Sequence, residues 1–338
     1  MKTENRHEST DGTGVSVPDF AAVEAAHELI RPYVHLTPVL TSAFLNALTG
    51  ADLHFKCENF QKAGAFKVRG ASNAVFGLDE ATAKRGVATH SSGNHALSLS
   101  YAAGQRGIPV TVVMPHTAPE AKKAAVRGYG GTIVECEPST SSREATFAEV
   151  VAHSGADFVH PYNDPRVIAG QATCSRELLQ QVEGLDDVIA PIGGGGMVSG
   201  TCLTLSSIAP STRIYAAEPI NADDAARSFH AGHIIADDAP STVADGLKVP
   251  LKELTWHFVS RHVTDVLTVS EQEIVDAMKL IWQRMKIVVE PSSAVTLAAI
   301  IRHRDLFVGQ RVGVILTGGN VDMDRLPWML QPFNTRES

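Results

Sequence analysis

The sequence contains few cysteines, and their spacing is typical of neither a zinc site nor a disulfide framework. Among 338 residues there are four, at Cys57, Cys136, Cys174 and Cys202, and no two of them form a Cys-x-x-Cys pair. Close pairs are typical of zinc sites, and dense cysteines are typical of small secreted domains. We therefore expect four buried thiols in a protein of the reducing cytoplasm.

Long apolar runs, basic runs and a hydrophobic leader are missing as well. No stretch approaches the roughly 18 apolar residues that span a membrane. The formal net charge is -8 and no run of lysines and arginines stands out, so we expect neither a membrane nor a nucleic acid as partner. Residues 1–17 are polar and lack the apolar region of a signal peptide, and they are predicted to be a disordered tail.

Two familiar nucleotide motifs are absent or incomplete. No GxxxxGK[ST] sequence occurs, which excludes a P-loop. Four glycines at 193–196 follow an apolar strand, but counting from either of the first two places Val198 or Ser199 at the last position of G-x-G-x-x-G. Glu218 ends the next strand, where a ribose-binding acid would lie. A dinucleotide-binding protein therefore remains a remote alternative.

Segments of strand and helix periodicity alternate along the chain. Helices are predicted from Asp19 to residue 30, after an N-cap at Thr117, and over 144–153 and 271–285. Strands are predicted at 53–57, where apolar and polar residues alternate, and at 109–114, 132–134, 188–190, 213–217 and 312–316. This alternation predicts an α/β fold of parallel sheets covered by helices, with the ligand at the carboxyl ends of the strands.

The segment Lys62-Ala63-Gly64-Ala65-Phe66-Lys67 places a lysine in small and apolar surroundings at the start of a helix. Most lysines are solvated, but burial lowers a lysine pKa because the charged form loses hydration. A neutral amine can attack an aldehyde and form a Schiff base. Lys67 is therefore a candidate nucleophile.

Two further loops carry polar groups where a ligand would lie. Ser91-Ser92-Gly93-Asn94-His95 precedes a helix, whose N-terminus can hold an anion, although these residues also favour simple turns. Thr317-Gly318-Gly319-Asn320 ends the last strand. The four glycines at 193–196 would let backbone N–H groups converge on a phosphate.

An acidic cluster after the strand at 213–217 suits a hard cation. Glu218 and Asp224 offer carboxylates, and the Ala222 carbonyl lies between them in the sequence. Oxygen ligands of this kind, completed by water, suit Mg²⁺. An acidic start to a helix, stabilised by the helix dipole, is the alternative.

Together these motifs resemble the fold-type II pyridoxal-phosphate enzymes, whose fold is like that of the tryptophan synthase β subunit. The resemblance runs from about residue 37 to residue 322 and is nearest to the serine/threonine dehydratase and serine racemase branch, which includes 3-hydroxyaspartate dehydratases. The segments that carry it are GAFKVRGA, HSSGNHA, PIGGGGMVSG, YAAEPINADD, ADGLK and LTGGNVD, in that order.

The resemblance implies a role for each matching residue. Lys67 would hold the cofactor and act as base, and Ser92 would be the acid/base on the opposite face. Phe66 would lie against the cofactor ring, Asn94 would bond its hydroxyl and Thr317 its pyridine nitrogen. The phosphate would be bound by Gly193, Gly194, Gly195, Gly196 and Met197, the substrate carboxylate by Ser91, Ser92 and His95, and a divalent metal (Mg²⁺, or Ca²⁺ or Mn²⁺) by Glu218, Ala222 and Asp224.

The resemblance also implies an architecture. A large cofactor-binding domain would comprise residues 18–80 and 165–332, and a small mobile domain would comprise residues 81–164. The active site would lie in the cleft between them, and the enzyme would be a homodimer.

Three residues depart from the family pattern. They are Ala65 in place of a common serine, Leu97 in place of a glutamine that helps to bind nucleotide in eukaryotic racemases, and Ala172 in place of a glycine. The departure at Leu97 puts nucleotide activation in doubt.

The implied reaction is loss of water and then ammonia from a small β-hydroxy amino acid, which leaves an oxo acid. The substrate candidates are serine, threonine and 3-hydroxyaspartate. A second carboxylate needs a cationic or multi-donor partner, for which Arg143, His160 and Asn163 are candidates. Several dehydratases have an acid where Asn163 stands, so the neutral amide favours hydroxyaspartate slightly. A serine racemase that uses Lys67 and Ser92 is the alternative.

Overall fold

The structure is a computed structural model that describes residues 16–236 and 240–329. Residues 1–15 of the predicted tail lie outside these ranges, whereas Val17 is described and packs against a hydrophobic core cluster. Within the described ranges, no helix has both the length and the apolar character needed to cross a membrane.

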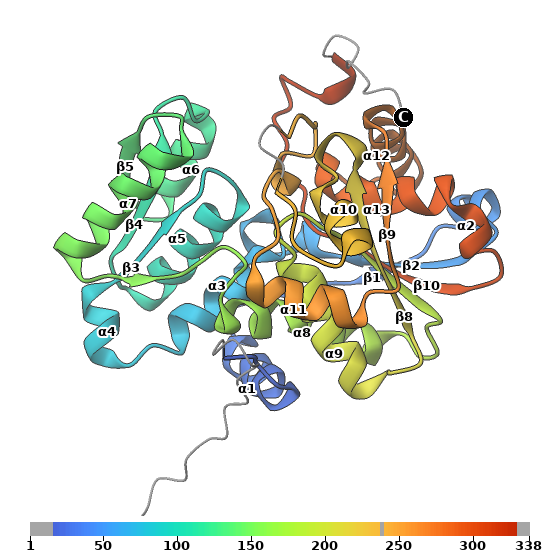
Figure 1. Cartoon of the computed structure of the whole chain (residues 1–338), viewed down its shortest axis with the longest axis horizontal. Coiled ribbons are helices and arrows are strands. Elements are labelled where there is room, and N and C mark those ends of the chain that lie inside the picture. Colours follow the sequence, from blue (N-terminus) through green and yellow to red (C-terminus); the bar gives the residue numbers. More distant parts are fainter. Residues whose placement is uncertain (1–15, 237–239, 330–338) are drawn as a thin grey trace, which may run out of the picture.

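The strands form two sheets in two lobes (Figure 1). The six-stranded sheet has the order β1-β2-β10-β7-β8-β9, with β1 antiparallel to β2 and the other pairs parallel. Its strands are β1 (Val39–Leu40), β2 (Asp52–Cys57), β7 (Asp187–Pro191), β8 (Arg213–Pro219), β9 (Asp265–Val269) and β10 (Arg311–Leu316). The parallel four-stranded sheet has the order β5-β4-β3-β6 and consists of β3 (Val87–His90), β4 (Val110–Pro115), β5 (Thr132–Cys136) and β6 (Asp157–Phe158).

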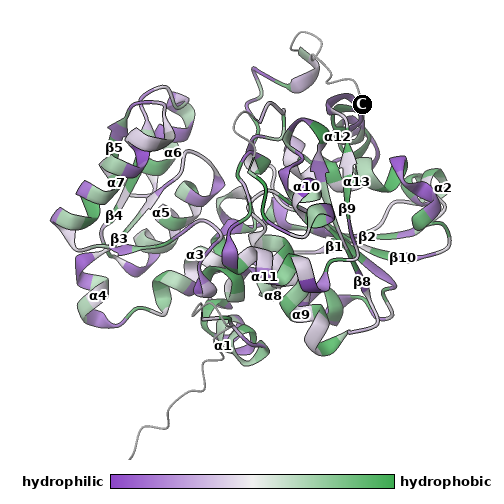
Figure 2. Cartoon of the chain, viewed as in Figure 1, coloured by the Kyte–Doolittle hydropathy of each residue, from purple (hydrophilic) through white to green (hydrophobic). Residues whose placement is uncertain are grey.

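Helices surround both sheets. Those of the smaller lobe are α4 (Glu80–Arg85), α5 (Asn94–Arg106), α6 (Glu120–Gly128) and α7 (Thr140–Ser154). The others are α1 (Phe20–Ile30), α2 (Ala43–Thr49), α3 (Lys67–Phe76), α8 (Pro165–Gln181), α9 (Gly196–Ile208), α10 (Asp224–Ala231), α11 (Glu253–His262), α12 (Glu271–Met285) and α13 (Pro291–Arg302). Helix α3 packs on both α5 and α8, and Figure 1 shows it between the lobes. Hydrophobic residues gather in the interior of both lobes in Figure 2.

Local capping explains where several helices begin. Helix α12 spans the predicted 271–285, because Ser270 and Glu273 form a capping box. Asp19 caps α1 as predicted. The predicted N-cap at Thr117 is wrong, because the N-cap residue of α6 is Pro119. The start predicted at residue 144 is also wrong: α7 begins at Thr140, since the Ser139 hydroxyl accepts from Ser142 N–H.

The alternating pattern of β2 does not reflect one exposed face. The strand lies inside the sheet between β1 and β10, and His54 and Lys56 are buried together with its apolar residues. The Lys56 ammonium is tolerated there because it is paired with Glu177 at 2.7 Å. The polar residues of this strand therefore do not mark a solvent-exposed face, because the charge of Lys56 is compensated by a buried ion pair.

The parallel strands bring the predicted site segments to one region. Asn94, the glycines at 193–196, Glu218 and Thr317 lie at or just after the carboxyl ends of β3, β7, β8 and β10 respectively. Hydrogen bonds between the lobes connect them, since the Asn94 amide on α5 donates to Glu290 before α13 at 2.9 Å. The topology thus places the candidate site where parallel sheets bind ligands.

Candidate active site

Lys67 is the first residue of α3 and is held from both sides. Before it, Phe66 N–H donates to the Thr317 carbonyl at 2.9 Å, and Ala65 pairs with Gly318. These bonds join the lysine segment to the end of β10. The Lys67 ammonium donates to the Pro161 carbonyl at 2.9 Å and lies 5.1 Å from the centroid of the Phe66 ring.

Burial changes the acidity of this lysine. Loss of hydration lowers the Lys67 pKa to about 8, and the nearby Glu290 carboxylate opposes the shift. Near neutral pH about a tenth of the amine is therefore uncharged, far more than for an ordinary lysine, and the uncharged form is the one that attacks a carbonyl or accepts a proton. The residue as a whole is partly buried, so the predicted loss of hydration applies mainly to its ammonium end.

The glycine loop admits no side chains. A Cβ on Gly194 would lie 2.6 Å from atoms of the Tyr162 ring, and one on Gly193 would lie 2.8 Å from the Leu247 Cα. Gly195 has φ +85°, a conformation that favours glycine. Helix α9 begins at Gly196 with Met197 in its first turn, where backbone N–H groups lack intrahelical partners. The loop therefore fits a bound phosphate.

Asn94 and Thr317 are each fixed by a residue that the sequence motifs did not identify. The Asn94 amide donates to both oxygens of Glu290, at 2.9 and 3.1 Å, and its oxygen accepts from Asn320 at 2.9 Å. Burial raises the Glu290 pKa to about 7, although the bond from Asn94 opposes this. The Thr317 hydroxyl lies 3.1 Å from that of Ser293. Glu290 precedes a proline that begins α13, a sequence signal for a helix start but not for a functional carboxylate.

The serine loop lies before α5. The Ser91 hydroxyl accepts from Gly93 N–H at 3.3 Å, and Ser92 is partly buried. The His95 imidazole is buried and its Nε2 lies 3.1 Å from the Val159 carbonyl. Burial and the Lys67 charge lower the His95 pKa to about 3. The neutral ring brings no positive charge to a carboxylate, so Ser91 and Ser92 are the better-placed candidates.

The three candidates for binding a second substrate carboxylate differ in how far their polar atoms are already hydrogen-bonded. The Asn163 amide oxygen accepts from Leu254 N–H at 3.2 Å, which commits it to the first turn of α11. His160 Nδ1 accepts from Asn163 N–H at 2.9 Å. Arg143 lies on α7, and its buried Nε has no hydrogen-bond partner within residues 16–236 and 240–329. Arg143 is therefore the candidate with unused donor capacity.

The acidic cluster is buried around the end of β8. Glu218 and Asp224 are 0% and 2% exposed. One Glu218 oxygen accepts from Ala226 N–H, and the other has no hydrogen-bond partner in the described part of the chain. Burial and the Asp224 charge raise the Glu218 pKa well above its usual range. In the described ranges, no group of three His, Cys, Asp or Glu residues could hold a metal ion.

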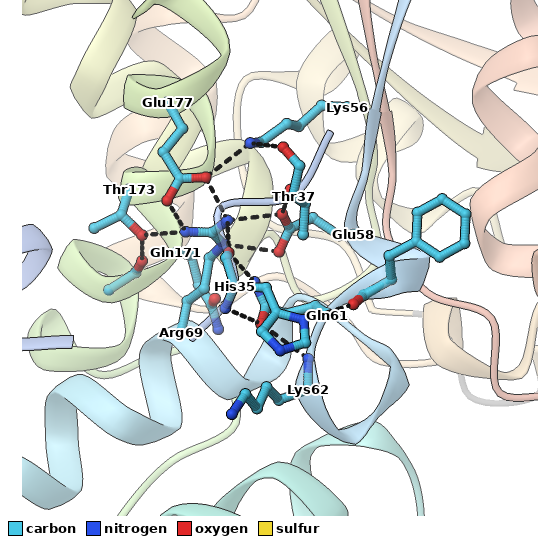
Figure 3. Close-up of polar contacts among 12 residues, drawn as sticks. His35, Thr37, Lys56, Glu58, Gln61, Lys62, Arg69, Gln171, Thr173 and Glu177 are labelled. Carbon is cyan, nitrogen blue, oxygen red and sulfur yellow. Dashed lines mark hydrogen bonds and ion pairs between the residues drawn. The ribbon is translucent and has the colours of Figure 1, made fainter. Parts of the chain in front are cut away.

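A buried ion network lies at the start of α3 (Figure 3). Arg69 is fully buried and bonds to both oxygens of Glu58, at 2.7 and 2.8 Å, and to both oxygens of Glu177, at 2.8 and 2.7 Å. Lys56 completes the set through Glu177 and the Thr37 carbonyl. Two positive and two negative side chains thus form a balanced, buried cluster around Arg69, which lies two residues after Lys67.

Comparison with known proteins agrees with this geometry. Residues 30–318 match the family model described as pyridoxal-phosphate dependent enzyme. This chain belongs to that family. The predicted fold-type II α/β fold is confirmed.

The relatives lie in the predicted branch. A beta-hydroxyaspartate dehydratase from Paracoccus denitrificans (strain Pd 1222) is 70% identical over 312 residues, 92% of this chain and 99% of the relative. The serine racemase of Homo sapiens is 46% identical, over 92% of this chain and 94% of the relative. Maize serine racemase has a TM-score of 0.90 at 46% identity, covering 91% and 95% of the two chains. The chain is therefore a pyridoxal-phosphate enzyme of the dehydratase and racemase branch.

Proposed function

We propose that this enzyme is a lyase that removes water from 3-hydroxyaspartate and releases ammonia and an oxo acid. The observation that carries the proposal is the 70% identity to a protein called beta-hydroxyaspartate dehydratase, against 46% to the serine racemases. The partly unsatisfied Arg143 supports it, since a second carboxylate needs a cation.

Pyridoxal phosphate, when bound, would supply the electron sink that makes the substrate α-proton acidic. Gly193, Gly194, Gly195, Gly196 and Met197 would hold its phosphate, and Phe66, Asn94 and Thr317 would position its ring. Lys67 Nζ would hold the cofactor covalently and then accept the α-proton, for which its lowered pKa suits it.

The substrate groups would be oriented by the loop before α5. Ser91 and Ser92 would bind the α-carboxylate at the helix N-terminus, and Ser92 would face the side of the substrate opposite Lys67. Loss of the α-proton and the β-hydroxide yields an enamine, which becomes an imine and is hydrolysed to the oxo acid and ammonia. A racemase would instead need Ser92 to return a proton before the hydroxide leaves.

A substrate panel tests the proposal. We expect one stereoisomer of 3-hydroxyaspartate to be turned over with a kcat/KM about 10 to 100 times that of L-serine or L-threonine. A charge-assisted hydrogen bond contributes about 1.5–3 kcal/mol, and 1.4 kcal/mol is about tenfold. Ammonia and oxo-acid release are measured with added cofactor and Mg²⁺. A preference for serine or threonine contradicts the assignment, and D-serine formation from L-serine without ammonia indicates a racemase.

We also propose a divalent metal, with Mg²⁺ as the first candidate, bound by Glu218, Asp224 and the Ala222 carbonyl. Two buried carboxylates and an unpartnered Glu218 oxygen support it. The cation would offset the repulsion between the acids at the end of β8.

Removal of the metal would therefore destabilise the protein. We expect chelation to lower the melting temperature by several degrees, since a metal that binds only the folded state stabilises it by about 2.7 kcal/mol at 100 times its Kd. Added Mg²⁺ should restore the wild type but not Asp224→Ala. If chelation leaves both melting temperature and activity unchanged, Glu218 and Asp224 only stabilise the start of α10.

Three broader assignments remain proposals. We propose a homodimer and the domain boundaries 18–80 with 165–332 and 81–164, as the family resemblance implies. We also propose a cytoplasmic location. Four cysteines that are all unpaired and buried support a reducing compartment.

A further inference from the structure

A row of ring side chains leads from the glycine loop toward α7. The Tyr162 ring packs against Gly194, where a Cβ would lie 2.6 Å away. The His160 ring centroid lies 4.7 Å from that of Tyr162 and 6.1 Å from that of His90, each edge to face. His160 belongs to the segment whose Pro161 carbonyl accepts from Lys67, so the row begins beside the nucleophile.

Both histidines in this row are neutral. Burial, aided by the charges of His90, Lys252 and Lys67, lowers the His160 pKa to about 3. Burial and the Arg143 charge lower the His90 pKa as well. The imidazoles therefore contribute hydrogen bonds but no charge at neutral pH.

The charges come from Arg143 and Lys252, one from each lobe. Arg143 projects from α7, and Lys252 is the N-cap residue of α11, beside Leu251 and Thr255, which line Gly195. Both charges lower the His90 pKa, and the Lys252 charge lowers the His160 pKa as well.

No acidic side chain in the described part of the chain pairs with either cation. In the described ranges, neither Arg143 nor Lys252 belongs to an ion pair, and the Arg143 Nε is buried without a partner. The neighbouring acids Glu144 and Glu253 are exposed. Two positive charges, one from each lobe, thus act on the row, and neither has a counter-ion among the described residues.

We propose that Lys252 is a specificity-determining residue that binds the β-carboxylate of the substrate together with Arg143. The inference rests on the proposed function, which places the α-carboxylate at the N-terminus of α5. A second carboxylate at the far end of the substrate would then meet both cations. Serine and threonine cannot supply it, so the pair selects a dicarboxylic amino acid over them.

The test compares Lys252→Met and Lys252→Arg with wild type. Lys252→Met should lower kcat/KM for 3-hydroxyaspartate by about 10- to 100-fold, the size of one charge-assisted hydrogen bond, and leave that for L-serine unchanged. Lys252→Arg should retain most of the selectivity. The side chain is exposed and forms no cap bond, so the fold should persist, and Lys84→Met on α4 is the matched surface control.

Inhibition by a dicarboxylate separates this inference from the assigned reaction. Succinate should inhibit wild type much more strongly than butyrate, and Lys252→Met should lose that difference. If Lys252→Met binds succinate as wild type does and keeps its selectivity, the role of Lys252 is wrong even where hydroxyaspartate is turned over. If wild type prefers serine yet Lys252→Met still loses succinate inhibition, the proposed reaction fails while the carboxylate site stands.

Discussion

Replacing Lys67 with alanine should abolish covalent retention of the cofactor and lower turnover by more than about 10²- to 10⁴-fold, the contribution of a general base alone. The loss should exceed that range because the same amine is also the nucleophile. Its lowered pKa makes the amine partly neutral, and its bond to Pro161 places it beside the segment whose Tyr162 ring packs against Gly194. Borohydride reduction followed by peptide mass analysis should find the reduced cofactor on the Lys67 peptide.

Lys62 provides the matched control because it lies in the same motif five residues earlier. It is partly exposed, and its ammonium lies 5.9 Å from the centroid of the Tyr101 ring. Lys62→Ala should keep the yellow colour, the covalent adduct and most of the turnover. An adduct on Lys62, or colour that survives borohydride in wild type, would overturn the assignment of Lys67.

Local sequence was sufficient for the parts of the site that lie within one loop. Lys67 and the four glycines stand in contiguous segments whose chemistry follows from neighbouring residues. Glu290 could not be found in this way, because its contact with Asn94 spans 196 positions and depends on the packing of the two lobes. The role proposed for Lys252 has no signal in the sequence either, since an exposed lysine at a helix start resembles any solvated charge.

In the fold, too, local sequence signals predict the elements but not the contacts between distant residues. The alternation of elements predicts parallel sheets, which the structure contains, and the pattern at 53–57 predicts a strand, which is β2, but not that its polar residues are buried. A charged residue in a strand normally indicates that its side chain faces solvent. Here Lys56 is fully buried because Glu177, 121 positions away, neutralises it. Pairing between distant residues overrides local polarity in such cases.

Arg69→Met should be the most destabilising single change in the buried network, at about 3–5 kcal/mol in the free energy of unfolding measured with urea. The methionine fills much of the arginine volume but leaves Glu58 and Glu177 without their shared partner in a fully buried site. Arg176→Met on α8 is the control, since its pair with Glu24 is partly exposed and should contribute less than about 1 kcal/mol. Equal effects of the two changes would contradict the prediction.

The pH dependence of this loss follows from Glu58. Although burial opposes it, the charges of Arg69 and Lys56 lower the Glu58 pKa in the folded protein. A lowered folded pKa contributes stability above the unfolded value of about 4.3, and that stability is lost as pH falls through the folded pKa. In Arg69→Met the charged Glu58 carboxylate would be buried without its main positive partner. The loss in the free energy of unfolding should therefore be larger at pH 8 than near pH 5, where the carboxylate can be protonated. Adding Glu58→Gln to Arg69→Met should therefore recover part of the stability at pH 8, whereas a further loss would show that Glu58 does not depend on Arg69.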